Sequence, residues 1–282
     1  MNKLSTAKRT AVVAALVEGN SIRSTARMVG VSKPTILKLL VQLGDACTQL
    51  HNVAVRNLRS RRVECDEVWQ FCYAKAKNVP EDKRNTFGYG DVWTWTAIDS
   101  DSKLIVSWLV GNRDTECAVM FMEDVASRIR TRIQLTTDGH RPYLEAVEGA
   151  FGMDIDYAML VKIYSGGPIA VDTRYSPPKI VSSTAEVIKG NPNPKHISTS
   201  YVERQNLTMR MHIRRFTRLT NAFSKKIENH AAAVALHFVH YNFCRVHQTL
   251  RVTPAMEAGI VDRVWSIADI VGLLDAADKK AA

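Results

Sequence analysis

Three acidic residues, far apart in the chain, stand in settings suited to binding a divalent cation. Glu203 is the only acid between Ser200 and Glu228, in a stretch that otherwise carries seven basic residues. A surface helix normally mixes charge signs, because opposite charges four positions apart stabilise it. A lone carboxylate among cations is instead expected where the acid binds a metal ion and the cations bind phosphates. Asp66 and Asp138 are the partner carboxylates that such a site requires.

The chemistry available to such a set of acids is metal-assisted displacement at phosphorus. Mg²⁺ prefers oxygen ligands, keeps several waters and is usually held by one or two carboxylates together with phosphate oxygens of the substrate. Two ions about 3.5–4 Å apart activate a water or a 3′-hydroxyl group and stabilise the leaving oxygen. We therefore expect two Mg²⁺ ions as cofactors, with Mn²⁺ as the alternative metal.

Neighbouring acids leave open which carboxylates belong to the set. Asp99 ends a strand beside the one that carries Asp66, so it could replace or join Asp66, although shaping a hairpin turn is the simpler role. Glu67 should point away from Asp66, because successive side chains of a strand face opposite sides, and we expect it to face solvent. Glu64 shares the face of Asp66 and is a candidate for supporting it from behind.

The segments that must position these acids alternate between strand and helix patterns. Period-two alternation of bulky side chains predicts strands, and apolar residues three and four positions apart predict helices. The predicted strands are Val63–Phe71, Val92–Asp99, Leu104–Val110, Ile133–Asp138 and Tyr157–Tyr164, and the predicted helices are Thr115–Arg130 and 142–151. A basic helix follows from Ser200, and a helical pattern continues to Tyr241. This order resembles an RNase H-like α/β core, a mixed sheet flanked by helices, in which Asp66, Asp138 and Glu203 converge at one end of the sheet.

The first fifty residues carry the pattern of three helices, at 6–18, 22–29 and 32–43. Serines at 21 and 32 are suitable N-caps, and the glycine at 30 suits the turn between the second and third helices. We expect a helix-turn-helix, an N-terminal all-α domain whose third helix lies in a DNA major groove. The side chains expected to face the DNA are those of Lys33, Thr35 and Lys38. An ordinary three-helix bundle is the alternative.

The charge of the chain agrees with a nucleic-acid partner. The 282 residues carry a net charge of +10 and have a pI near 9.4, which favours a polyanion as the partner. Residues 1–62 hold eleven basic residues against two acidic ones, and a second group of cations follows Glu203. Two basic regions imply two contacts with the nucleic acid, and a generic basic surface is the alternative.

Cysteine usage and hydropathy indicate the cellular compartment in which we expect the protein. The five cysteines have no paired spacing, so they indicate neither a disulfide framework nor a zinc site. No apolar run approaches the roughly 18 residues of a membrane span, and the first residues lack the pattern of a secretory signal. We therefore expect a cytoplasmic protein without membrane contact.

Four short stretches together resemble one family of enzymes. They are 66–69 (Asp-Glu-Val-Trp), 137–143 (Thr-Asp-Gly-His-Arg-Pro-Tyr), 201–206 (Tyr-Val-Glu-Arg-Gln-Asn) and 241–250 (Tyr-Asn-Phe-Cys-Arg-Val-His-Gln-Thr-Leu). Over about residues 60–260 the chain resembles the bacterial insertion-sequence transposases of the DDE (RNase H-like) type, most closely the insertion-sequence-one-like family. Each stretch alone is only weakly specific. The interval from Asp138 to Glu203 is longer than is common in related enzymes, and the Gly- and Pro-rich segment 165–199 accounts for it as an irregular insertion.

The resemblance implies that Asp66, Asp138 and Glu203 are the catalytic metal ligands. It also implies a basic residue seven positions after the glutamate, here Arg210. At 3.6 residues per turn, Arg210 and then Arg214 share the helix face of Glu203, where they could contact a DNA phosphate. The expected DNA-binding cations after the glutamate are Arg204, Arg210, Arg214 and Arg215. Accessory candidates, each of which a turn or tertiary packing would also explain, are His140, Arg245 and His247.

The expected protein is a transposase that binds the ends of a mobile element and catalyses metal-dependent DNA cleavage and strand transfer. Its expected parts are a helix-turn-helix domain (1–50), a basic linker (51–62), an RNase H-like catalytic domain (63–250) with the insertion 165–199, and a C-terminal helical tail (251–282). The partners would be double-stranded DNA, both terminal inverted repeats and target DNA, in the bacterial nucleoid. Because two ends are processed, we expect a homodimer or a higher oligomer on DNA. The alternatives are a non-catalytic, domesticated DNA-binding regulator and an RNase H-like nuclease without transposition.

Overall fold

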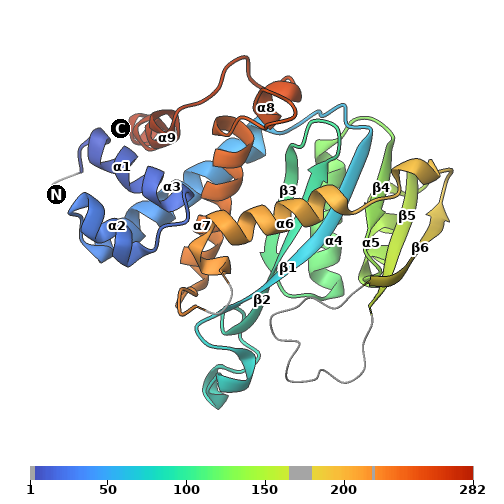
Figure 1. Ribbon diagram of the computed structural model, residues 1–282, viewed down its shortest axis with the longest axis horizontal. Coiled ribbons are helices and arrows are strands. Elements are labelled where there is room, and N and C mark those ends of the chain that lie inside the picture. The colour runs from blue at the N-terminus through green and yellow to red at the C-terminus, as the bar shows by residue number, and fades with distance from the viewer. Residues whose placement is uncertain (1–3, 165–179, 218–219, 282) are drawn as a thin grey trace.

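The computed structural model, which describes residues 4–164, 180–217 and 220–281, contains a six-stranded mixed sheet beside a group of N- and C-terminal helices (Figure 1). The strands are β1 (Arg62–Cys72), β2 (Gly90–Asp99), β3 (Ile105–Gly111), β4 (Ile133–Thr137), β5 (Ile155–Tyr164) and β6 (Ile180–Lys189). Their order across the sheet is β3-β2-β1-β4-β5-β6. The pairs β1–β4 and β4–β5 are parallel, whereas β1–β2, β2–β3 and β5–β6 are antiparallel.

This topology is compatible with the RNase H-like core expected from the sequence. An antiparallel three-stranded unit is joined to two parallel strands, and a helix follows both β3 and β4. The five strands predicted from alternation all form, with ends shifted by no more than two residues. The antiparallel hairpin of β2 and β3 turns at Asp99, which accepts hydrogen bonds from the backbone N–H groups of Asp101 (2.8 Å) and Ser102 (3.0 Å). Asp99 therefore has the turn-shaping role.

The segment 165–199 differs from the irregular insertion that was expected. Residues 165–179 lie outside the described part of the chain, but Ile180–Lys189 forms β6 and pairs antiparallel with β5 at the edge of the sheet. The prolines and glycines on both sides of 180–189 dominated the composition of the whole segment. They concealed a ten-residue segment in which five residues are β-branched, a composition that favours a strand. Residues 190–199 then carry the chain through a 3₁₀ turn, Pro194–His196, to the next helix.

Helices cover both faces of the sheet (Figure 1). Helices α4 (Thr115–Arg128) and α5 (Pro142–Phe151) pack together on one face, and α6 (Ser200–His212) crosses β1 on the other. The basic helix ends at His212, and the 3₁₀ turn η5 (Arg214–Phe216) precedes α7 (Ile227–Val239), so the expected continuous helical stretch does not form. The helix stops because Ile213 leaves the helical region (φ −105°, ψ 103°) and is buried in the core together with Phe216.

The N-terminal helices are α1 (Thr6–Val17), α2 (Ile22–Val29) and α3 (Lys33–Ala54). The Ser21 hydroxyl accepts a hydrogen bond from Ser24 N (3.0 Å) and caps α2, and the Ser32 hydroxyl caps α3. Helix α3 continues eleven residues beyond its expected end, and Gly44 lets it approach α7 closely. A Cβ atom added at Gly44 would lie 2.4 Å from Cβ of Ala232.

The C-terminal segment returns to the N-terminal helices. After a π-turn (His240–Cys244) and the short helix α8 (Pro254–Glu257), helix α9 (Ile267–Ala281) packs against α1 and α3. The buried guanidinium group of Arg9 on α1 donates to the Asp275 carboxylate on α9 at 3.1 Å. The two ends of the described chain are thereby joined. Within the described residues, no helix combines the length and hydropathy that crossing a membrane requires.

Candidate active site

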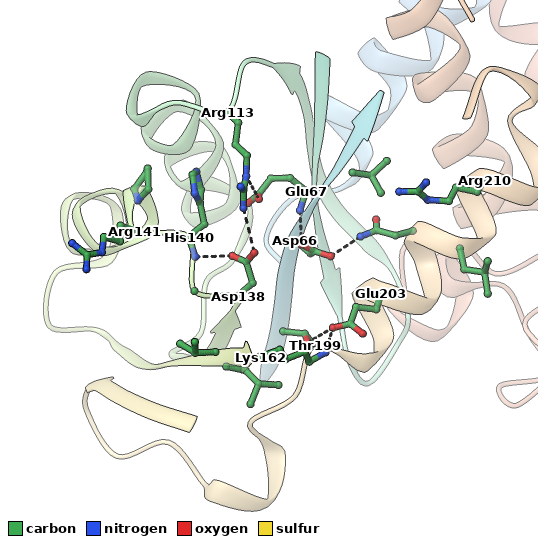
Figure 2. A pocket seen from close by; sticks show the side chains of 17 residues that line it. Asp66, Glu67, Arg113, Asp138, His140, Arg141, Lys162, Thr199, Glu203 and Arg210 are labelled. Atoms are coloured by element: carbon green, nitrogen blue, oxygen red, sulfur yellow. Dashed lines mark hydrogen bonds and ion pairs between the residues drawn. The ribbon is translucent and has the colours of Figure 1, made fainter. Parts of the chain in front are cut away.

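The three acids singled out from the sequence line one cavity of about 1120 Å³ (Figure 2). Asp66 lies in β1, and Asp138 directly follows β4, the parallel neighbour of β1. Strand β4 ends there because Asp138 and Gly139 form a turn, in which Asp138 Oδ1 accepts the N–H of His140 (3.0 Å), before Pro142 starts α5. Glu203 lies in the first turn of α6. Residues more than 60 positions apart are thus brought to one end of the sheet.

Asp66 and Asp138 form a tight carboxylate group with Glu67, whose role the sequence did not predict. One carboxylate oxygen from each of these three residues lies within 4.8 Å of the others. Glu67 does point to the opposite face of β1 from Asp66, as alternation requires. However, α4, α5 and the loop after β3 cover that face, so Glu67 is 7% exposed and the expectation that it faces solvent is wrong.

Glu203 lies in the same cavity but outside this group. Its Oε1 atom accepts a hydrogen bond from the Thr199 hydroxyl (2.6 Å) and pairs with the ammonium group of Lys162 on β5 (Figure 2). The side chain of Glu203 is 44% exposed. The structure therefore holds Glu203 against a lysine, and its carboxylate would have to exchange this partner to bind a metal ion together with Asp66.

Asp66 is oriented by both of its oxygens. Oδ1 accepts the backbone N–H of Glu67 at 2.8 Å, and Oδ2 accepts the amide N–H of Asn206 at 2.7 Å. Asn206 follows Glu203 by three positions, so the two side chains share a face of α6. One helix face thereby supplies a candidate ligand and the group that orients a second one.

Arg113, in the loop after β3, partly balances the carboxylates. Its Nε atom donates to Glu67 at 3.1 Å, and a terminal nitrogen donates to Asp138 at 3.4 Å. The guanidinium carbon lies 4.9 Å from the centre of the Trp93 ring, a cation–π distance that fixes the arginine over β2. Arg113 therefore forms ion pairs with both Glu67 and Asp138. Within the described part of the chain, Asp66 accepts hydrogen bonds only from the neutral groups described above.

The negative charge of the three carboxylates is only partly balanced by Arg113, so a bound cation would be favoured. Burial raises the pKa of Asp66 to about 7, with further repulsion from Asp138. Burial, again with repulsion from Asp138, raises the pKa of Glu67 to about 8. The Tyr143 hydroxyl on α5 faces the Glu67 carboxylate and lowers its pKa in part, but burial and repulsion from Asp138 outweigh this contact. Because the donors are carboxylate oxygens with unbalanced negative charge, this set fits a hard divalent cation such as Mg²⁺ or Mn²⁺.

The structure brings some of the other predicted residues to this cavity and leaves others outside it. His140 and Arg210 line it, and Arg210 shares α6 with Glu203 as the helical spacing indicated. Arg204 is exposed on α6 and does not line the cavity. Arg214 and Arg215 lie in η5 and do not line it either, because α6 ends at His212. The expectation that Arg214 shares the helix face of Glu203 is therefore wrong.

The remaining predicted residues lie away from the acids. Arg245 and His247 follow the π-turn and do not line the cavity, whereas Asn242 in the same stretch is buried and bonds both backbone groups of Ile105. At the N-terminal end of α3, three side chains are exposed: Lys33, Thr35 and Lys38.

Four residues of the site escaped the sequence reasoning: Glu67, Arg113, Lys162 and Asn206. Asn206 could have been found, since a polar side chain three positions after Glu203 must share its helix face. Lys162 could have been noticed as the only cation in a mostly apolar strand. Arg113 and the burial of Glu67 carried no local signal, because both depend on which loop and helices cover the far face of β1.

Transposases are among the solved structures that are similar to the chain, whereas no sequence match is found. By sequence, the chain matches no protein-family model and no curated protein. By structure, it is similar to a piggyBac transposase synaptic complex with hairpin DNA, with 12% identity and a TM-score of 0.39 over 95% of this chain and 69% of that one. A Mos1 transposase paired-end complex with the left transposon end has 11% identity and a TM-score of 0.25, covering 56% and 59% of the two chains. The Mos1 strand transfer complex has 11% identity and a TM-score of 0.24, covering 84% and 77%. TM-scores at this level carry no argument about function.

Proposed function

We propose that the chain is a DDE-type transposase that cuts and joins DNA with divalent metal ions. The observation that carries the proposal is the meeting of Asp66, Asp138 and Glu203 in one open cavity beside the cation Arg210. These residues come from two parallel strands and a helix of an RNase H-compatible sheet. Simple DNA binding gives no reason to gather acids in a cavity that must receive a phosphate backbone.

Each residue has a distinct task in this function. Asp66 and Asp138 would hold the metal ions, with Glu67 as an additional oxygen donor, and Glu203 would complete the set from α6 after leaving Lys162. The ions, when bound, activate the attacking hydroxyl group and stabilise the leaving oxygen. Asn206 keeps the Asp66 carboxylate turned into the cavity through its hydrogen bond.

The cations in and around the cavity would bind the phosphates of the DNA substrate. Arg210, two helical turns after Glu203, lines the cavity at a position suited to a DNA phosphate. Lys162, once released by Glu203, would offer a second positive charge beside the same phosphate. Arg204, Arg214 and Arg215 would contribute to DNA binding outside the cavity.

The N-terminal helices would recognise the ends of the element. Lys33, Thr35 and Lys38 are exposed at the start of α3, where a helix-turn-helix protein contacts base edges and phosphates. Since each reaction processes two ends, the working form would be a dimer or a larger assembly on DNA. This recognition distinguishes a transposase from a nuclease of the same fold.

The test uses labelled element ends with Mg²⁺, for the wild-type chain and for Asp138→Ala. We expect both to bind the ends and only the wild-type chain to cut and join them. If neither cuts nor joins, the chain is a DNA-binding regulator and the enzyme proposal is wrong. Cleavage of branched duplexes without preference for the ends would instead indicate a nuclease.

A further inference from the structure

A second groove, of about 740 Å³, lies beside the acidic cavity, and apart from Arg210 and Arg215 its lining residues have no part in the function described above. It is formed by the C-terminal half of β1, the turn η5 and the chain from 220 to 225. The two hollows share one lining residue and adjoin along β1. Residues 66–68 of β1 line the acidic cavity, residues 69–71 line the groove, and Arg210 lines both.

Four half-exposed aromatic rings line the groove. Trp69 and Phe71 alternate along β1, so their side chains share one face. Tyr73, which follows β1 in the left-handed region (φ 67°), also lines the groove. The Phe71 ring lies 5.9 Å from Trp69 and 4.7 Å from Phe223, measured between ring centres. Aromatic rings that are part of a hydrophobic core are normally covered, whereas these four keep surface open to solvent.

The backbone holds Phe223 in this row. The N–H of Tyr73 donates to the carbonyl of Ser224 at 2.8 Å, and Cys72 pairs with Ser224 as in a parallel strand. The chain after η5 is thereby fixed along the end of β1, which places Phe223 beside Phe71. The row of rings is a built feature that does not depend on side-chain packing alone.

The rings are surrounded by positive charge. Lys225 lies 4.6 Å from the centre of the Phe223 ring and 5.6 Å from that of Tyr73, and Lys75 and Lys77 are exposed at the rim. Arg215, whose pKa burial lowers to about 10, lines the inner wall. Among the described residues that line this groove, none is acidic.

We propose that this groove binds unpaired nucleotides of a DNA strand. Aromatic faces stack on bases of any sequence, and cations beside them follow the phosphate backbone. A duplex keeps its bases stacked on one another and would leave the rings unused. An apolar peptide would leave the lysines without partners. The role of the groove, to hold a frayed or displaced strand whose backbone continues into the acidic cavity past Arg210, rests on the proposed function, but the binding itself does not.

The test measures fluorescence anisotropy of a labelled 12-nucleotide oligothymidine and of a 12-base-pair duplex, both in EDTA so that no cleavage occurs. Phe223→Leu and Phe71→Leu keep apolar volume while removing a ring. We expect each to weaken oligothymidine binding about fivefold or more, with a smaller effect on the duplex. Phe87→Leu is the matched control, because Phe87 is also an exposed aromatic side chain (45%) near the same end of the sheet but does not line the groove.

A second arm tests the charge. The double variant Lys75→Gln/Lys77→Gln should lower the slope of log K against log salt for oligothymidine by about 1.4, since each phosphate contact on a single strand contributes about 0.7. Lys195→Gln, which removes an exposed lysine in the 3₁₀ turn Pro194–His196, outside the groove, should leave the slope unchanged. Circular dichroism and thermal unfolding verify that every variant is folded.

The outcomes separate this inference from the proposed function. Equal oligothymidine affinity in Phe223→Leu and Phe87→Leu overturns the inference, as does an equal loss of single-strand and duplex binding. Neither result bears on whether the wild-type chain cuts and joins element ends. Conversely, a chain that binds oligothymidine through the groove and never cuts ends would overturn only the transposase proposal.

Discussion

Glu64 on β1 holds the first turn of α6 through the backbone of Tyr201. Oε2 of the buried carboxylate accepts the N–H of Tyr201 at 2.8 Å and that of Val202 at 3.1 Å. Glu64 precedes Asp66 by two positions, and Tyr201 precedes Glu203 by two. The bond therefore ties the strand that carries one candidate ligand to the helix that carries another. The expectation that Glu64 supports the acids from behind agrees with this geometry.

We predict that Glu64→Gln reduces DNA cleavage about tenfold or more while leaving the protein folded. The amide keeps the shape of the side chain but loses the negative charge that favours a helix N-terminus. A looser α6 should also raise the Mg²⁺ concentration needed for half-maximal rate, which a purely structural role would not change. Cleavage rates across a Mg²⁺ titration measure both effects. Glu116→Gln, in the first turn of α4, is the matched control and should behave as wild type.

Replacing Asp66 with asparagine should stabilise the metal-free protein. The substitution removes one of three carboxylates whose oxygens lie within 4.8 Å of one another, so the free energy of unfolding in EDTA should rise by about 1–2 kcal/mol. The same variant should lose the increase in melting temperature that Mg²⁺ produces by binding the native state. Thermal unfolding with and without Mg²⁺ checks both signs. Lower stability in EDTA would contradict the idea that these acids repel one another.

Gly44→Ala should destabilise the protein by about 1–3 kcal/mol, in spite of the higher helix propensity of alanine. The added Cβ atom would lie 2.4 Å from Cβ and 2.5 Å from Cα of Ala232, so α3 and α7 must separate. Gly149→Ala, in α5, meets nothing within 4 Å and should stabilise by about 0.5–1 kcal/mol. Urea unfolding compares the two variants. A Gly44→Ala protein as stable as wild type would show that the helices are not tightly packed.

Acid should unfold the protein partly through His51. Burial, with Arg128 nearby, lowers the pKa of His51 to about 3, and its Nε2 atom lies 3.2 Å from the carbonyl oxygen of Ile105. The unfolded state binds the proton more readily, so the stability contribution is complete above about pH 6.5 and is lost as pH falls towards 3. His51→Gln should reduce the pH slope of the unfolding free energy by up to about 1.4 kcal/mol per pH unit. Urea unfolding between pH 7 and 4.5 measures the slope, and an unchanged slope in His51→Gln would contradict the prediction.

Much of the sheet could be predicted because bulky apolar side chains alternate with other residues along its strands. β1 and β2 alternate and lie between turn residues, and the helices after β3 and β4 have clear apolar faces. β6 was missed because glycine and proline on both sides outweighed a ten-residue strand of which only five residues are β-branched. The stop in the basic helix at Ile213 was missed because it depends on tertiary burial of that side chain, which no local pattern records.

The site was predictable as a set of acids but not as a set of contacts. Asp66 and Asp138 converge because parallel neighbouring strands end at one edge, which topology alone implies. The pairing of Glu203 with Lys162 and the bridge from Arg113 to Glu67 depend on which elements face each other across the cavity. Such partners are separated by about 40 residues in the chain, so the spacing of residues along the sequence does not reveal these contacts.

The length of α3 has a consequence for where the DNA would be cut. Its 22 residues extend over about 33 Å, with Lys33 exposed at one end, Gly44 pressed on α7 midway and His51 anchored to β3 near the other. In the proposed transposase, α3 would fix the distance between the recognised bases, at its N-terminal end, and the scissile bond, near its C-terminal end. Moving the recognition sequence by about five base pairs would turn that bond to the far side of the duplex, out of reach of the acids.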